Sequence, residues 1–195
     1  PYHAPAMANP LPESVQPAEL ASREQVFEFK GKVGDFERLC GIVDADLSAL
    51  EAADRPRGWK DRPVTGRLAF RWLDARQAYP AADGSLSATL AAVCQRCLEG
   101  FEMPLDSSFS ILFANESETG GAAEDTPGYE SWTLDNDSVR LQDVVEESLI
   151  MALPLAPVHR SPKDCGNLAT GMPTEEADEV RPFADLRAQM DEAGN

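Results

Sequence analysis

Residues 64–72 read VTGRLAFRW, and two runs of the same kind follow, LSATLAA at 86–92 and FEMPLDSSFSILF at 101–113. In each run apolar residues recur at every second position, which is the side-chain period of a β-strand with one buried face. The links between the runs are short, and short links join antiparallel neighbours. The middle of the chain therefore predicts an antiparallel sheet, which could curl into a barrel.

The flanking residues predict further elements of an α+β domain. A strand is expected at 25–32, and a helix over 35–50, where the apolar residues have helical spacing. An acidic loop rich in Gly and Ala at about 114–130 precedes a short strand at 130–134 and a second helix, which Pro154 ends. The predicted fold is one α+β domain with two main helices.

Composition separates two terminal segments from this domain, which is expected at 20–160. Residues 1–19 are a Pro-rich leader and 161–195 an extended acidic tail, and both have the composition of disordered chain. Within the tail, the sequence PFADL at 182–186 is amphipathic. It indicates a docking patch at 181–190, for the domain itself or for a partner.

The net charge of −17 is unevenly distributed. Residues 1–80 carry 11 Lys and Arg against 12 Asp and Glu, a balance of −1. Residues 81–195 carry the remaining 6 against 22, a balance of −16. Such a surface repels nucleic acid in general, so any RNA contact has to be local, whereas the acidic half favours basic partners.

The sequence predicts a cytoplasmic protein with reduced thiols. No apolar run approaches the roughly 18 residues of a membrane-spanning helix. The Pro- and Ala-rich start lacks the cationic and apolar regions of a secretory signal. Four cysteines in 195 residues do not make a disulfide framework.

Cys94 and Cys97 form a Cys-x-x-Cys pair at the link between the second and third alternating runs. A zinc site would need two further ligands, for which His159 and Cys165 are the candidates. A redox pair normally opens a helix, whereas strands are expected on both sides here. Two small thiols packed at a turn are the third interpretation. The sequence leaves this choice open, and Zn²⁺ is the one cofactor that it suggests.

Basic residues cluster in the first of these runs and in the loop before it. Together with Arg96 in the cysteine turn, they are the candidate nucleic-acid contacts: Arg55, Arg57, Lys60, Arg62, Arg67, Arg71, Arg76 and Arg96. Trp59 and Trp72 lie among them, and an exposed indole or guanidinium can stack on unpaired bases. The alternative is an ordinary charged sheet face beside an exposed loop, with Trp72 in the core.

The sequence contains no recognisable catalytic motif. The two histidines, His3 and His159, have no nucleophile motif around them. Glu146 and Glu147 are adjacent on the expected helix and cannot face each other as a glycosidase pair does. A Gly-rich phosphate-binding loop is also missing. An enzyme is therefore not expected.

Several short motifs occur in a defined order after Arg38-Leu39. They are CQRCL at 94–98, VVEE at 144–147, ALPLAPVH at 152–159, Cys165 and PFADL at 182–186. In this order, along roughly residues 20–190, the chain resembles the YceD family of bacterial large-subunit ribosomal RNA accumulation proteins.

The resemblance implies a role in the synthesis, processing or stability of large-subunit (23S) ribosomal RNA, and hence in ribosome biogenesis. It implies no established reaction or cofactor. The positions that match its motifs are Cys94, Gln95, Arg96, Cys97, His159 and Cys165. Cys40 and the Pro-rich leader are departures from its pattern.

Three hypotheses follow. The first is a non-enzymatic ribosome-assembly factor that contacts rRNA through its basic face, with rRNA, ribosomal proteins or pre-ribosomal particles as partners. The second is an adaptor or holdase for a basic ribosomal protein, without RNA contact. The third is a zinc or thiol sensor built on the cysteines. None involves a membrane or a small-molecule substrate.

Overall fold

The computed structural model describes residues 11–74, 79–115, 126–134 and 136–166. Arg76, most of the predicted leader, most of the acidic loop and the tail from residue 167 lie outside these residues, as does the predicted docking patch. Among the described residues, no helix is long and apolar enough to cross a membrane.

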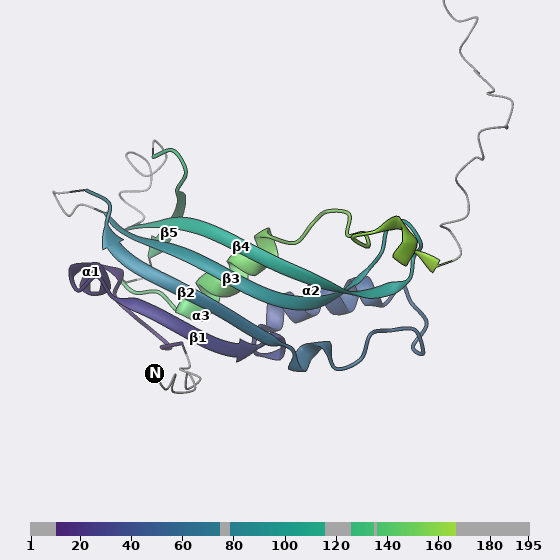
Figure 1. Cartoon of the computed structure of the whole chain (residues 1–195). Coiled ribbons are helices and arrows are strands. Elements are labelled where there is room, and N and C mark those ends of the chain that lie inside the picture. Colours follow the sequence, from purple (N-terminus) through teal and green to yellow (C-terminus); the bar gives the residue numbers. More distant parts are fainter. Residues whose placement is uncertain (1–10, 75–78, 116–125, 135, 167–195) are drawn as a thin grey trace, which may run out of the picture.

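A five-stranded sheet forms one layer of the domain (Figure 1). Its strands follow the order of the chain: β1 (Val26–Lys32), β2 (Pro63–Trp72), β3 (Pro80–Val93), β4 (Gly100–Asn115) and β5 (Glu130–Leu134). The first four pair antiparallel, as the alternating runs predict. The α+β fold predicted from the sequence is confirmed.

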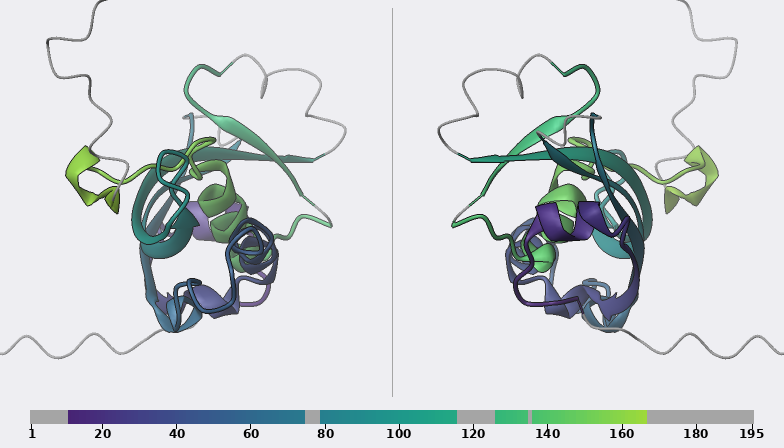
Figure 2. Two further views of the ribbon diagram at one scale, coloured as in Figure 1. Left: turned by 90° about the vertical axis from the view of Figure 1, so that its right-hand side faces the viewer. Right: turned by 90° about the vertical axis from the view of Figure 1, so that its left-hand side faces the viewer.

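The fifth strand differs from the antiparallel prediction. β5 runs parallel to β4, with Glu130 paired to Ile111. A parallel neighbour needs a longer connection than a hairpin. The acidic segment between Asn115 and Glu130 has that length. β1 and β5 are the two edges, so the sheet is curved but does not close into a barrel (Figure 2).

Three α-helices cover one face of the sheet: α1 (Pro17–Ser22), α2 (Glu37–Leu47) and α3 (Leu141–Met151). α1 packs on β2, α2 on β3 and α3 on β4, and the sheet curves around them (Figure 2). The sequence predicted the two longer helices but not α1. The predicted domain boundary at residue 20 falls inside α1, and Val15 forms an antiparallel bridge to Val139.

The core lies between the helices and the sheet face that the alternating residues form. Leu68, Leu90 and Ile111 come from three neighbouring strands and are almost completely buried. They meet Leu39 of α2 and Leu149 of α3 in the same cluster. The opposite face of the sheet carries mostly Ser, Thr and charged side chains, but Ala81, Leu112 and Ala114 are buried there in a second, smaller apolar cluster. The alternation in the sequence therefore separates the two faces over most of the sheet but not around this cluster.

A buried carboxylate joins the two longer helices. Glu146 of α3 is 6% exposed, and its Oε1 accepts hydrogen bonds from the backbone N–H groups of Arg38 (2.7 Å) and Leu39 (3.1 Å). These are orphan donors of the first turn of α2, and Phe36 at its N-cap provides no side-chain cap. Glu147 pairs on the surface with the Arg38 guanidinium. The VVEE motif therefore caps α2 from a distant part of the chain.

Candidate metal centre and basic surface

The cysteine pair lies in the tight turn that joins β3 to β4. The Cys94 N–H donates to the Glu99 carbonyl (2.9 Å), and the Leu98 N–H donates back to the Cys94 carbonyl (2.8 Å). Leu98 has a φ of 61°, in the left-handed region. The Arg96 N–H lies 3.4 Å from the Cys94 sulfur. The turn thus curls around the Cys94 thiol and directs a backbone donor at it.

The other two candidate ligands reach this turn from the segment after α3. The Gln95 N–H donates to the Pro157 carbonyl (2.8 Å), which holds this segment beside the turn. The His159 ring packs on Phe101 of β4, with 4.5 Å between ring centroids. A short 3₁₀ turn, Pro162–Asp164, then carries the chain to the buried Cys165.

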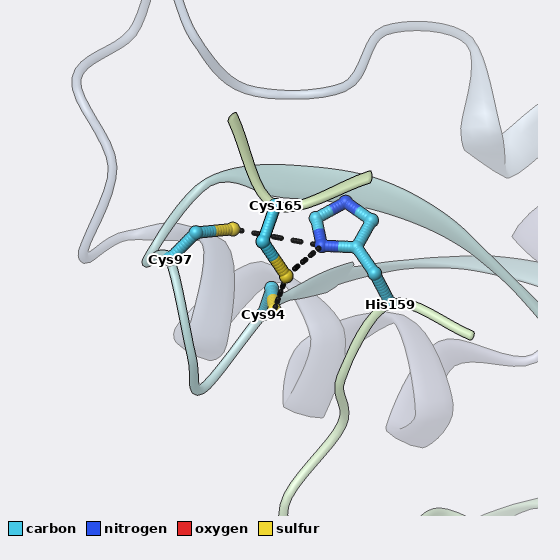
Figure 3. A group of neighbouring side chains, drawn as sticks. All are labelled: Cys94, Cys97, His159 and Cys165. Carbon is cyan, nitrogen blue, oxygen red and sulfur yellow. Dashed lines mark hydrogen bonds between the residues drawn. The ribbon is translucent and has the colours of Figure 1, made fainter. Parts of the chain in front are cut away.

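Four ligand atoms converge in the space between the turn and the segment (Figure 3). The sulfurs of Cys94, Cys97 and Cys165 and a ring nitrogen of His159 all lie within 4.8 Å of one another. His159 Nδ1 is 3.5 Å from the Cys97 sulfur and 3.5 Å from the Cys165 sulfur. The sulfurs of Cys94 and Cys165 are 3.9 Å apart. All four cysteines of the chain are unbridged.

These separations fit a tetrahedral zinc ion. Zn–S bonds of about 2.3 Å and a Zn–N bond of about 2.0–2.1 Å put sulfur ligands about 3.8 Å apart, and sulfur and nitrogen about 3.5 Å apart. Three Cys and one His supply all four positions of such a site. Closed sites of this kind stabilise structure, whereas catalytic zinc sites keep a position for water or substrate.

The surroundings of the cluster shift the pKa values of Cys94 and Cys97 in opposite directions. Burial disfavours the charged form of Cys94, but hydrogen bonds from the backbone N–H groups of Cys97, His159 and Arg96 outweigh it and lower the pKa of this thiol to about 6. Burial raises the pKa of Cys97, and the nearby thiols of Cys94 and Cys165 raise it further. The cluster therefore holds a thiolate at neutral pH, and a cation would favour further ionisation.

The structure around Cys94 and Cys97 does not favour the redox interpretation of the pair. A redox Cys-x-x-Cys opens a helix, whereas Cys94 follows β3 and Cys97 precedes β4. Cys40, which the sequence left outside the cluster, lies on α2, where its thiol donates to the Val33 carbonyl (3.3 Å).

Most of the candidate nucleic-acid contacts are engaged within the protein. Arg62 pairs with Glu102, Lys60 pairs with Asp44, and Arg71 pairs with Asp83 and hydrogen-bonds Tyr129. Arg55 donates to the carbonyls of Leu50 and Ser48, near the C-terminal end of α2. The Arg96 guanidinium lies 3.6 Å from the Cys165 sulfur. Arg57 and Arg67 are exposed and have no ion pair among the described residues.

The tryptophans do not form an exposed stacking surface. Trp59 is 6% exposed and belongs to the core, with the Lys60 ammonium over its ring. Trp72 is half-buried at the end of β2. The expectation that an indole lies open beside the basic residues is therefore wrong for Trp59, because hydrophobic burial takes precedence over exposure there.

A groove of about 660 Å³ crosses the outer face of the sheet over β1 to β4. Arg67 lines it together with Lys30, which the sequence analysis missed. Ser85 and Ser87 of β3 form its middle, and Asp106 lies at the β4 side. Lys30 could have been found from its position next to the buried Phe29, because neighbouring residues of a strand point to opposite faces.

The arrangement defines a small α+β protein with a cluster of three Cys and one His at one end of a curved sheet. We call the cysteine turn and the segment that carries His159 and Cys165 the knuckle. A family model described as "Large ribosomal RNA subunit accumulation protein YceD" matches residues 82–188. The chain belongs to this YceD family, whose role is in the accumulation of large-subunit ribosomal RNA and hence in ribosome biogenesis. Comparisons with curated proteins and with solved structures find no match.

The family match begins within β3 and includes the whole candidate metal centre. The Cys turn, the capping Glu146 and the Pro-rich segment that leads to His159 are thus parts of one family unit. Among the described residues, the cysteine turn meets the segment that carries His159 and Cys165, and VVEE meets Arg38-Leu39. The thiols of Cys94 and Cys165 are neighbours although 71 residues separate them in sequence.

Proposed function

We propose that this protein supports large-subunit rRNA accumulation as a non-catalytic binding protein, held together at one end by a structural Zn²⁺. The observation that carries the zinc proposal is the convergence of three sulfurs and one imidazole nitrogen within 4.8 Å. Cys94, Cys97, His159 and Cys165 would hold the ion. Bound zinc would cross-link the β3–β4 turn to the segment after α3, and its four protein ligands leave no position for catalysis.

The proposed rRNA contact is the groove on the outer sheet face. Arg67 and Lys30 both line the groove, and both are exposed. Neither forms an ion pair with another residue of the groove. Ser85, Ser87 and Thr65 add hydroxyls that can bond to phosphate and ribose oxygens. The groove also contains Glu28 and Asp106, so its formal charge is balanced. The proposed contact therefore rests on Lys30 and Arg67 each binding a single phosphate, and not on a cationic field that would attract RNA in general.

The test is binding of large-subunit rRNA fragments by Arg67→Glu and Lys30→Glu variants. Each lost phosphate contact should weaken binding and reduce the salt slope by about 1. Arg23→Glu is the matched control. Arg23 is an exposed residue at the C-terminal end of α1, so its replacement changes the charge by the same amount but outside the groove. Wild-type affinity and salt slope in a variant that combines Arg67→Glu with Lys30→Glu would refute the rRNA contact.

A second candidate is an adaptor for a basic ribosomal protein. The net charge of −17 and the ion pairs of Arg62, Lys60 and Arg71 favour this function, because they leave few cations for RNA. Partners that stay bound to the purified protein after nuclease treatment would support it. Their complete release by nuclease would refute it in favour of RNA binding.

A further inference from the structure

Three exposed aliphatic side chains lie on the two chain segments that form the candidate metal centre, and we call them the aliphatic patch. Leu98 of the cysteine turn is 64% exposed, Val158 is 43% exposed and Leu155 is fully exposed. The hydrogen bond from Gln95 to Pro157 holds the two chain segments side by side, and both segments lie at one end of the molecule (Figure 1). Water contact with such a group of aliphatic side chains is unfavourable.

This end is also locally basic in an acidic protein. Arg96, Arg160 and Lys163 are exposed around the patch. Within the described part of the chain, Arg160 and Lys163 form no ion pair. The acidic residues of the same segments are Glu99 and Asp164. The local balance is therefore positive, whereas the chain as a whole carries −17.

The chain beyond residue 166 has the complementary chemistry. It contains seven Asp and Glu against two Arg, a balance of −5, and four of these acids lie in Glu175–Glu179. Val180, Phe183, Leu186 and Met190 then follow at spacings of three, three and four, which place them on one face of a helix. Pro182 is compatible with a first helical turn.

The end of the described chain lies at the patch itself. A Cβ atom on Gly166 would lie 2.8 Å from the Glu99 carboxylate, so the chain leaves the knuckle beside the cysteine turn. The family match extends to residue 188. It therefore includes Val180, Phe183 and Leu186, three of the four apolar residues of this helix face. A flexible chain of 14 residues spans about 20 Å. Such a tether gives an effective concentration in the millimolar range, so a weak contact is enough to keep the segment bound.

We propose that residues 180–190 dock as a short amphipathic helix on the patch formed by Leu98, Leu155 and Val158 of the same molecule. The acidic run Glu175–Glu179 then lies against Arg160 and Lys163. The patch offers aliphatic side chains and no exposed aromatic ring, which favours an apolar helix face over stacked bases. This inference does not rest on the proposed RNA contact or on zinc binding.

The test is hydrogen–deuterium exchange of the full-length protein. Residues 180–190 should exchange at least about tenfold more slowly than an unstructured peptide, because docking orders their amides. Phe183→Ser and Leu98→Ser should each remove this protection. The double variant Arg160→Glu, Lys163→Glu should weaken it, as should high salt. Ile42→Ser is the control, since Ile42 is an exposed aliphatic residue of α2, away from the patch.

Unchanged protection of β2 and β3 in each variant shows that the domain is still folded. If Leu98→Ser disturbs the cysteine turn, the effect of Phe183→Ser on the exchange of residues 180–190 still tests the docking, because Phe183 is not part of the folded domain's described residues. Exchange of residues 180–190 at the free-peptide rate in the wild type would overturn the proposal. Protection that increases with protein concentration would also overturn it, because the segment would then be docking on a second copy.

Discussion

Glu146 illustrates how one side chain can join two distant motifs. Its carboxylate accepts the N–H groups of Arg38 and Leu39 from a buried position. The negative charge also lies at the positive end of the α2 dipole. From the sequence alone Glu146 and Glu147 are equivalent, and only the packing of α3 on α2 makes one buried and the other exposed.

We expect Glu146→Ala to lower the free energy of unfolding by about 2 kcal/mol, because it leaves the buried N–H of Leu39 and the part-buried N–H of Arg38 without a partner. Glu146→Gln should cost less, since the amide oxygen can still accept. Glu147→Ala is the matched control and should cost less than about 1 kcal/mol, as a surface ion pair does. Chemical denaturation measures all three, and equal losses at the two positions would contradict the capping role.

The thiols of the cluster give zinc binding a defined pH dependence. The pKa of Cys94 is lowered to about 6, so this thiol is ionised above that pH and becomes protonated below it. The pKa of Cys97 is raised, so zinc has to displace its proton even at neutral pH. Protons therefore compete with the metal increasingly as the pH falls.

Acidification from about pH 7.5 to about pH 5.5 should weaken zinc binding by well over tenfold, because zinc has to displace the proton of Cys97 throughout this range and that of Cys94 increasingly below about pH 6. Competition with a chromogenic chelator at a series of pH values measures this change. The same titration in Cys40→Ser should be indistinguishable, since Cys40 lies outside the cluster. An affinity independent of pH over this range would contradict thiolate ligation.

At the scale of elements, local patterns predicted the structure well where the signal is periodic. The alternating runs became β2, β3 and β4, and the helical stripes became α2 and α3. The parallel pairing of β5 could not be predicted, because five residues do not encode which way a strand runs against its neighbour. The short helix α1 was missed because its Pro-rich surroundings resemble disordered chain, although Pro17 at its first turn is a valid start signal.

The four residues of the cluster could be proposed from the sequence, but their geometry could not. Cys94 and Cys97 are near each other in sequence, whereas His159 and Cys165 join them only through the path of the chain after α3. The basic face was predicted from residue type alone. Its ion pairs depend on partners such as Glu102 and Asp83, whose positions follow from strand register and not from spacing.

The segment after α3 should depend on the metal for its position. Among the described residues, one backbone–backbone hydrogen bond joins this segment to the cysteine turn, and it runs from the Gln95 N–H to the Pro157 carbonyl. Chelation should therefore speed amide exchange in residues 157–165 by at least about tenfold, as local opening does, and leave β2 and β3 unchanged. Exchange that is the same with and without chelator would contradict the cross-linking role of zinc.

As a whole molecule, the protein combines a curved sheet, a helical layer and a knuckle at one end (Figure 1). Its charge excludes general attraction to RNA, so function has to depend on particular surfaces. The groove with Arg67 and Lys30 is the surface proposed to contact RNA, and the aliphatic patch on the knuckle is the surface proposed to bind the C-terminal segment. The knuckle positions the aliphatic patch and the point at which the chain leaves the domain after residue 166.

The zinc content of the natively purified protein is the most direct test of the metal centre. Elemental analysis should find one zinc per chain, with the same ratio in Cys40→Ser and a ratio near zero in Cys97→Ser. Extraction with a thiol reductant present, followed by zinc reconstitution, guards against loss during purification. A zinc ratio near zero in the wild type, both as purified and after reconstitution, would contradict the metal centre.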